Sequence, residues 1–366
     1  MDILKIFQNI EGANIESINK AKVYQLSLAK PPRSLGLLED ISVKLAGITG
    51  KLFNDVNRRC LLVFSADNGV VEEGVSSTPM SVTLAQSINL TKGLTGASVL
   101  AKTYHTDLFV YDVGINAGTG EINDPHFINK KIALGTKNIS RGPAMSYDEA
   151  IEAITIGYEA VKSRINDYDI FGIGEMGIGN TTTSSAVLAS LLNVDVEIVT
   201  GKGAGLSDEK YLHKIDIINK AIKVNKPNSS DVIDVLSKVG GFDLAAMTGA
   251  YLACAYYKKP VVVDGFISIV ASLCAYRINN KVKDYLFLSH ESFEIGYKLA
   301  KDELGLEPMF NLKMRLGEGS GCPIAFEIIH GACSIMNNMA TFSKAQINDD
   351  YIEEIIGEEN FTIKDK

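Results

Sequence analysis

The stretch that decides the fold is DIFGIGEMGIGNTTTSSAVLASLL, residues 169–192. It begins with a short apolar run (169–174), passes through a loop that carries further glycines, and ends in a helix-length segment (182–192). A short, almost continuous apolar run is typical of a strand that is buried on both faces of a parallel sheet. The stretch therefore predicts one strand–loop–helix unit, the building block of α/β folds.

The same pattern recurs along the chain. Five more apolar runs are predicted to be strands: 61–66, 108–113, 196–201, 260–265 and 285–290. Helix-length segments lie between them, among them 146–165, 208–224 and 242–257. Alternation of strands and helices implies right-handed crossovers. We therefore expect an α/β fold, a doubly wound three-layer α/β/α arrangement with a mostly parallel sheet of about six strands.

The two ends of the chain are helical in pattern and poor in strands. We expect residues 31–321 to form the α/β domain. Residues 1–30 and 322–366 are expected to form a small helical subdomain from the chain ends.

Composition excludes several classes of function. The 366 residues carry a net charge of −8 that is spread along the chain, which argues against a nucleic-acid partner and against a membrane surface. The N-terminus is amphipathic and acidic, unlike a signal peptide, so a cytoplasmic location is expected. Five scattered histidines and five cysteines without a CxxC motif give no metal-ligand pattern. No metal and no cofactor is expected.

Polar and glycine-rich segments follow all six predicted strands. In open α/β sheets, ligands bind beyond the carboxyl ends of the strands. Loops between strands and helices need glycine and capping residues in any case, which accounts for DGF and SHES. GEMGIGNTTT and TGKGAG hold more glycine than a cap requires, so we expect one polar cleft at this edge.

The glycine loop fits two familiar patterns. Gly172, Gly174 and Gly177 match G-x-G-x-x-G, with acids about twenty residues later, as in a Rossmann-type oxidoreductase. The loop also fits a Walker A motif that lacks its lysine. Glu175 would repel a pyrophosphate, so a single phosphate held by backbone N–H groups at a helix N-terminus is the better interpretation. A second loop, 200–205, contains Gly203 and precedes Lys210 and Lys214.

The segment RLGEGSGCP (315–323) places Glu318 between two glycines. Glycine allows a ligand to come close to the backbone, and a carboxylate in a partly desolvated pocket gains affinity for protons. Glu318 is therefore either a general base or an incidental acid in a glycine-rich turn.

Ten segments, taken together and in order, resemble the nicotinate-nucleotide–dimethylbenzimidazole phosphoribosyltransferase family, which makes the lower-ligand nucleotide of cobamides. They are KPPRSLGLLEDIS, FSADNGVVEEGVSSTP, DVGIN, GTKNISRGPAMS, GEMGIGNTTT, GKGAGLSDE, GGFDLAAMTGA, VVDGFI, LFLSHES and MRLGEGSG. The resemblance runs nearly from end to end.

The resemblance implies transfer of phosphoribose from nicotinate mononucleotide to an aromatic base. It implies that Glu318 is the general base and that Glu175 contacts the ribose or the developing cation at the anomeric carbon. It assigns phosphate and ribose binding to a set of loop residues with one lysine: Gly177, Ile178, Gly179, Asn180, Thr181, Gly203 and Lys214. It assigns the base pocket to Ser76, Gln86, Asp67 and Leu316. Asn68 stands where the family usually has histidine, which leaves the preferred base (benzimidazole, purine or phenol) open.

The family implies small-molecule substrates, no metal or redox cofactor, and a homodimer. Two alternatives stay open at this point: a nucleotide-binding Rossmann-type oxidoreductase, and a non-catalytic relative that binds a nucleotide or a base.

Overall fold

The computed structural model describes residues 3–202 and 205–350. The chain divides into two compact units. The first unit contains Met1–Glu11 and Arg58–Phe326, and the second contains Gly12–Asn57 and the chain from Glu327 onward.

The first unit is built on one sheet, in the order β3-β2-β1-β4-β5-β6-β7, and every neighbouring pair is parallel. Its strands are β1 (Arg59–Ala66), β2 (Thr106–Gly114), β3 (Phe127–Asn129), β4 (Ile170–Met176), β5 (Val261–Val263), β6 (Leu286–His290) and β7 (Pro308–Phe310). β1, β4, β5 and β6 are buried along their whole length. Burial on both faces explains why these strands are apolar without alternation. The expected α/β class with a mostly parallel sheet is confirmed.

One predicted strand is wrong. The run at 196–201 contains a 3-10 helix, η2 (Val196–Ile198), and no strand. β4 pairs directly with β5, so the sheet has no position for a strand between them. The side chain of Thr200 instead donates a hydrogen bond to the carbonyl of Val196, 2.7 Å away. β3 and β7 were not predicted, because strands of three residues are too short to show a pattern.

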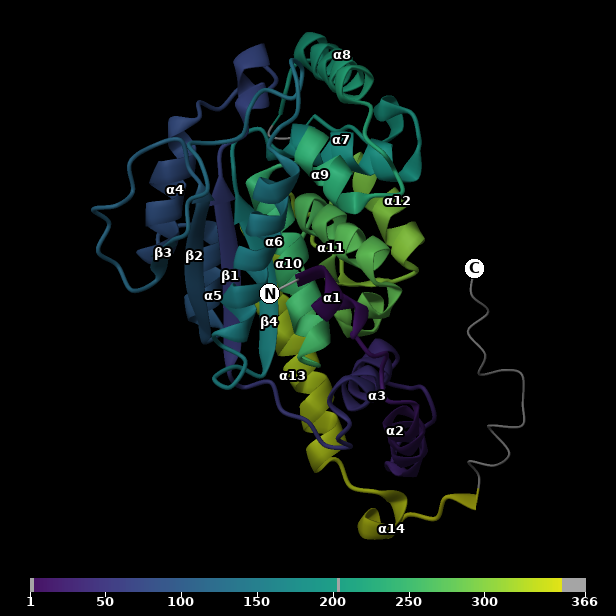
Figure 1. Ribbon diagram of the computed structural model, residues 1–366. Coiled ribbons are helices and arrows are strands. Elements are labelled where there is room, and N and C mark those ends of the chain that lie inside the picture. Colours follow the sequence, from purple (N-terminus) through teal and green to yellow (C-terminus); the bar gives the residue numbers. More distant parts are fainter. Residues whose placement is uncertain (1–2, 203–204, 351–366) are drawn as a thin grey trace. The chain divides into compact units, whose positions relative to one another are not determined.

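Helices cover both faces of the sheet, as Figure 1 shows. The helices of this unit are α1 (Ile3–Gln8), α4 (Ser81–Thr91), α5 (Gly96–Thr103), α6 (Tyr147–Lys162), α7 (Asn180–Leu192), α8 (Asp208–Asn225), α9 (Val232–Val239), α10 (Phe242–Tyr256), α11 (Phe266–Ile278) and α12 (Ile295–Leu304), with the 3-10 helices η1 (Gly69–Glu73) and η3 (Asn280–Tyr285). α10 packs on β1, β2 and β4 and against α6 and α11. On the other face, Ser87 of α4 donates a hydrogen bond to Ser65 of β1 (2.9 Å).

Glycines in β4 let the chain that carries Glu318 approach the sheet on the face of α4. A Cβ atom at Gly172 would lie 2.6 Å from Cβ of Cys322, in the first turn of α13 (Gly321–Asn338). A Cβ atom at Gly174 would lie 2.5 Å from the nitrogen of Gly319. The first two glycines of the G-x-G-x-x-G pattern therefore serve close packing.

The second unit consists of α2 (Ile15–Ser27), α3 (Leu37–Thr49), the later turns of α13 and α14 (Phe342–Ala345). Ala21, Ala46 and Met336 form its buried core. The sequence boundaries lay at 30/31 and 321/322, whereas this unit extends to Asn57. The reason is that α3 packs on α2: Gly47 lies so close to Ile18 that an added Cβ atom would be 2.7 Å from its side chain.

Candidate active site

A cavity of about 260 Å³ lies at the carboxyl ends of the strands of the first unit. Its walls come from the loops after β1, β4, β5, β6 and β7, together with α4 and α8. Parallel strands end at one edge of the sheet, which brings together segments that are far apart in the sequence. The expected polar cleft is confirmed for these strands. The loop after β2 is not part of the lining; Asp112, near the end of that strand, is buried and forms an ion pair with Lys131 (2.7 Å).

The backbone around Glu318 is an unusual turn. Glu318 has φ = 61°, and its neighbours Gly317 and Gly319 have φ = 83° and 77°. A non-glycine residue in the left-handed region costs about 1–2 kcal/mol and persists only where its surroundings hold it. Asp264, at the end of β5, accepts hydrogen bonds from the N–H groups of Gly319 (3.1 Å) and Gly321 (2.7 Å). This buried carboxylate fixes the turn that presents Glu318.

The carboxylate of Glu318 lies against the cavity with unused capacity to accept a proton. The residue is 6% exposed, and its Oε1 accepts a hydrogen bond from Gln86 (3.3 Å). Its Oε2 is buried and makes no hydrogen bond of normal geometry among the described residues, although the Thr95 hydroxyl and the Ala97 N–H lie near this carboxyl and favour its ionised form. Burial raises the pKa of this carboxyl above its ordinary value of 4.5. These are the properties of a general base that works in a desolvated site.

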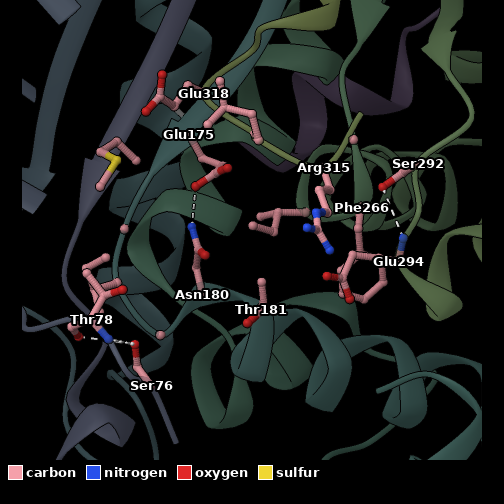
Figure 2. A pocket seen from close by; sticks show the side chains of 18 of the residues that line it. Ser76, Thr78, Glu175, Asn180, Thr181, Phe266, Ser292, Glu294, Arg315 and Glu318 are labelled. Carbon is pink, nitrogen blue, oxygen red and sulfur yellow. Dashed lines mark hydrogen bonds between the residues drawn. The ribbon is translucent and has the colours of Figure 1, made fainter. Parts of the chain in front are cut away.

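Glu175 is the second carboxyl group of the cavity. Figure 2 shows it facing Asn180, whose side-chain amide donates to Glu175 and also to Asp243, at 3.1 Å. Burial, and then the charge of Asp243, raise the pKa of Glu175 to about 8. This carboxyl is therefore mostly protonated at pH 7, where the sequence suggested a carboxylate. A cationic centre brought next to it would favour ionisation.

The loop after β4 and its helix provide the anion-binding features. Gly179 has φ = 92° and precedes α7, whose N-terminus carries the positive end of the helix dipole. Ile178 donates its N–H to the side chain of Thr83 (3.1 Å). Gly177 approaches the carbonyl of Ala66 so closely that an added Cβ atom would lie 2.3 Å from its oxygen. All the residues from Gly177 to Thr181 line the cavity.

Lys214 of α8 lies next to this helix N-terminus. It is 1% exposed, and its Nζ donates to the side chain of Thr181 (3.0 Å) and to the carbonyl of Gly201 (3.2 Å). Burial lowers the pKa of Lys214 to about 8, although the charge of Glu294 acts in the opposite direction. A buried ammonium group at a helix N-terminus is well suited to a phosphate. Gly203, expected in the same group, lies outside the described residues.

The residues expected around the aromatic base are only partly together. Ser76, Gln86 and Leu316 line the cavity with Glu318. Asp67 does not: its carboxylate accepts from the side chain of Thr83 (2.6 Å) and from the N–H of Asn116 (2.8 Å), and it is 2% exposed. Asp67 therefore supports neighbouring loops from behind the cavity.

Asn68, where the family usually has histidine, is fully buried and does not line the cavity either. Its amide lies 3.4 Å from the carbonyl of Ile178. The substitution therefore bears on the loop after β4, and not directly on the wall of the base pocket.

Sequence reasoning missed several residues of the site. In the sequence, the loop that contains Asp264 is accounted for by ordinary capping needs, and no pattern marks Asp243, Phe266, Glu294 or Arg315 as site residues. Asp264 could have been found from the sequence, because it is an acid directly after the buried strand VVV. The others become visible only when separate loops meet.

The described part of the chain contains no group of three histidine, cysteine or acidic side chains that could hold a metal ion. No helix in the same part is long and apolar enough to cross a membrane.

Known proteins are similar in sequence over nearly the whole chain. A family model described as phosphoribosyltransferase matches residues 10–347. The nicotinate-nucleotide–dimethylbenzimidazole phosphoribosyltransferase of Clostridium perfringens (strain ATCC 13124) is 51% identical over 360 residues, which cover 98% of this chain and 99% of that protein. The protein of the same name from Clostridium tetani is 46% identical and covers 93% of this chain and 94% of its own length.

The fold has a solved counterpart. The crystal structure of nicotinate-nucleotide–dimethylbenzimidazole phosphoribosyltransferase from Thermus thermophilus matches with a TM-score of 0.87 at 33% identity. The match covers 92% of this chain and 99% of that one.

Proposed function

The chain belongs to the nicotinate-nucleotide–dimethylbenzimidazole phosphoribosyltransferase family, and we propose from this premise that it transfers phosphoribose from nicotinate mononucleotide to dimethylbenzimidazole or a related base. The products are nicotinate and an α-ribazole 5′-phosphate, the nucleotide of the cobamide lower ligand. The single observation that carries the assignment of the residues is Glu318, a buried carboxylate with an unpartnered oxygen at the wall of a cavity that also contains a buried lysine.

In this reaction a ring nitrogen of the incoming base attacks the anomeric carbon. The bond from this carbon to the pyridinium nitrogen of nicotinate breaks, and its electron pair neutralises that nitrogen. The N–H proton of the base passes to Oε2 of Glu318. Attack from the face opposite the leaving group inverts the configuration, which gives the α-riboside.

The remaining residues hold the donor. We assign the phosphate to Lys214, Thr181 and the N-terminus of α7, where an ammonium group and the helix dipole add their fields. Gly203 belongs to this group by resemblance. Ser76, Gln86 and Leu316 line the end where the base would lie next to Glu318. Asp67 supports this end indirectly.

Glu175 has a role at the sugar. As the bond to nicotinate breaks, positive charge develops at the anomeric carbon. Placed next to that carbon, Glu175 would ionise and stabilise the charge. Its contact with Asn180 keeps the side chain oriented toward the cavity (Figure 2).

The experiment is a nicotinate-release assay with nicotinate mononucleotide and dimethylbenzimidazole, followed by the variant Glu318→Gln. Glutamine keeps the shape of the side chain and cannot accept the proton, so we expect kcat to fall about 10²–10⁴-fold while the donor still binds. Glu307→Gln, which removes an exposed acid paired with Lys301, is the matched control and should keep full activity. Full activity of Glu318→Gln would exclude Glu318 as the base.

Three finer points are part of the proposal. A panel of imidazoles, purines and phenols in the same assay identifies the preferred base. We also propose that the protein acts in the cytoplasm and as a homodimer, on the strength of its resemblance to the family. Light scattering coupled to gel filtration tests the homodimer, and a monomeric mass would refute it.

A further inference from the structure

The donor in the proposed function carries two anionic groups, a phosphate on the ribose and a carboxylate on the pyridine ring. Among the described residues, three cationic side chains line the cavity: Lys202, Lys214 and Arg315. Lys202 forms an ion pair with Asp208. Lys214 lies at the helix N-terminus that suits the phosphate. Arg315 is therefore the remaining cation of this set for the second anion.

Arg315 is free to bind a ligand. Within the described residues it makes no ion pair and no hydrogen bond, and its guanidinium carbon lies 5.9 Å from the centre of the Phe293 ring. Burial raises the pKa of Glu294, and the charges of Lys214 and then of Arg315 act in the opposite direction. Glu294 therefore interacts with both cations and does not pair with Arg315 alone. Figure 2 shows Arg315 directed into the cavity near Phe266 and Glu294. A guanidinium group binds a carboxylate through two parallel N–H donors.

The position of Arg315 relative to the general base, Glu318, fits the geometry of an inverting displacement. Arg315 and Glu318 are three residues apart on one segment, so their Cα atoms are at most about 10 Å apart. Nucleophile and leaving group must lie on opposite sides of the anomeric carbon. In the view of Figure 2, Ser76 and Thr78 lie on one side of Glu175 and Asn180, and Arg315 and Phe266 lie on the other.

Phe266 supplies the second feature of a leaving-group site. This residue is 4% exposed, starts α11, and lines the cavity with its ring packed on Gly296, where an added Cβ atom would lie 2.6 Å from the ring. An aromatic face stabilises a cationic ring such as the pyridinium of the donor. A guanidinium group and an aromatic ring on one wall together match a pyridinium that carries a carboxylate.

We propose that Arg315 binds the carboxylate of the nicotinate ring and so makes the enzyme select nicotinate mononucleotide over nicotinamide mononucleotide. The proposal rests on the proposed function and adds the residue that recognises the leaving group. A carboxamide lacks the negative charge and offers the guanidinium group one acceptor in place of two. Selection therefore follows from the loss of a charge-assisted, two-point contact.

The test compares both mononucleotides as donors to dimethylbenzimidazole in Arg315→Met. We expect kcat/KM for nicotinate mononucleotide to fall about 10–100-fold, the usual consequence of losing a hydrogen-bonded charge pair. The value for nicotinamide mononucleotide should change less than about threefold, so that the preference disappears, because a neutral carboxamide gains little from the guanidinium charge. Arg315→Lys should restore part of the preference for nicotinate mononucleotide. Calorimetric binding of free nicotinate and free nicotinamide to each variant should show the same pattern.

Lys313→Met is the matched control, because it removes one positive charge from the same segment at a residue that does not line the cavity. Its donor preference should equal that of the unchanged protein. An equal loss for both donors in Arg315→Met, or a preference that survives there, would overturn the role of Arg315. Failure of the proposed function is distinguishable: the unchanged protein would then release no nicotinate at all, while the calorimetric comparison would still decide whether Arg315 binds the carboxylate.

Discussion

Gly174→Ala should separate the position of Glu318 from its chemistry. Gly174 lies in β4, directly beneath the turn that carries the base. An added Cβ atom would lie 2.5 Å from the nitrogen of Gly319, 2.6 Å from its Cα atom and 2.7 Å from the carbonyl carbon of Glu318. All three are backbone atoms, so no side-chain rotation can relieve the clash.

The magnitude follows from these distances. Carbon atoms in contact normally lie about 3.5–4.0 Å apart, so the turn must move by about 1 Å. A displacement of that size in a catalytic group costs on the order of 100-fold in rate. Overpacking of this kind also lowers the free energy of unfolding by about 1–3 kcal/mol. The phosphate-binding residues around Lys214 lie elsewhere in the cavity, so KM for nicotinate mononucleotide should change less than kcat, even though Gly174 is next to Glu175.

The assay is nicotinate release at a temperature where the variant is still folded, with thermal unfolding measured in parallel. Gly142→Ala is the control, because a Cβ atom there would meet nothing within 4 Å. That variant should keep both its rate and its melting temperature. If Gly174→Ala kept the rate and stability of the unchanged protein, the close approach of β4 and the Glu318 turn would be refuted as a condition of activity.

Two further predictions concern the buried charges. Lys214→Met should raise KM for nicotinate mononucleotide about 10–100-fold, with a smaller effect on kcat. In the unchanged protein, the affinity for this donor should fall above pH 8, because the ammonium group of Lys214 has a pKa of about 8. Calorimetry measures this affinity. The pKa of Glu175 is raised from 4.5 to about 8. Between these two pH values the folded state binds more protons than the unfolded state. The contribution of Glu175 to stability is therefore lost as the pH rises from 4.5 through about 8. Glu175→Gln should therefore flatten the decline in the free energy of unfolding between about pH 5 and pH 8, measured by urea titration; an unchanged slope would contradict the raised pKa.

Much of the fold could be predicted because local pattern and burial agree. The runs that became β1, β2, β4, β5 and β6 are apolar since the sheet is covered on both faces. The run at 196–201 is also rich in β-branched apolar residues but is not a strand, because neighbouring strands already occupy the positions where it could pair. Local composition cannot report which positions in a sheet are already filled.

The candidate site divides in the same way. The glycines next to Glu318 and Glu175 draw attention to these two acids, and the resemblance implies their roles. Lys214 is predicted by the anion-suited loops before it together with the resemblance. Asp67 was placed in the base pocket by resemblance, but hydrogen bonds to Thr83 and Asn116 keep its carboxylate away from the cavity.

The sequence by itself determined the α/β class, the family and the chemical identity of the principal groups, because buried strands and glycine-rich loops can be recognised in short stretches of sequence. Only the tertiary structure decided how these groups behave. Asp264 holds the turn of Glu318 across 54 residues of chain, and Asp243 acts on Glu175 across 68. Burial and charge act through space, so the pKa of a carboxyl and the freedom of an arginine depend on neighbours that the order of residues does not reveal.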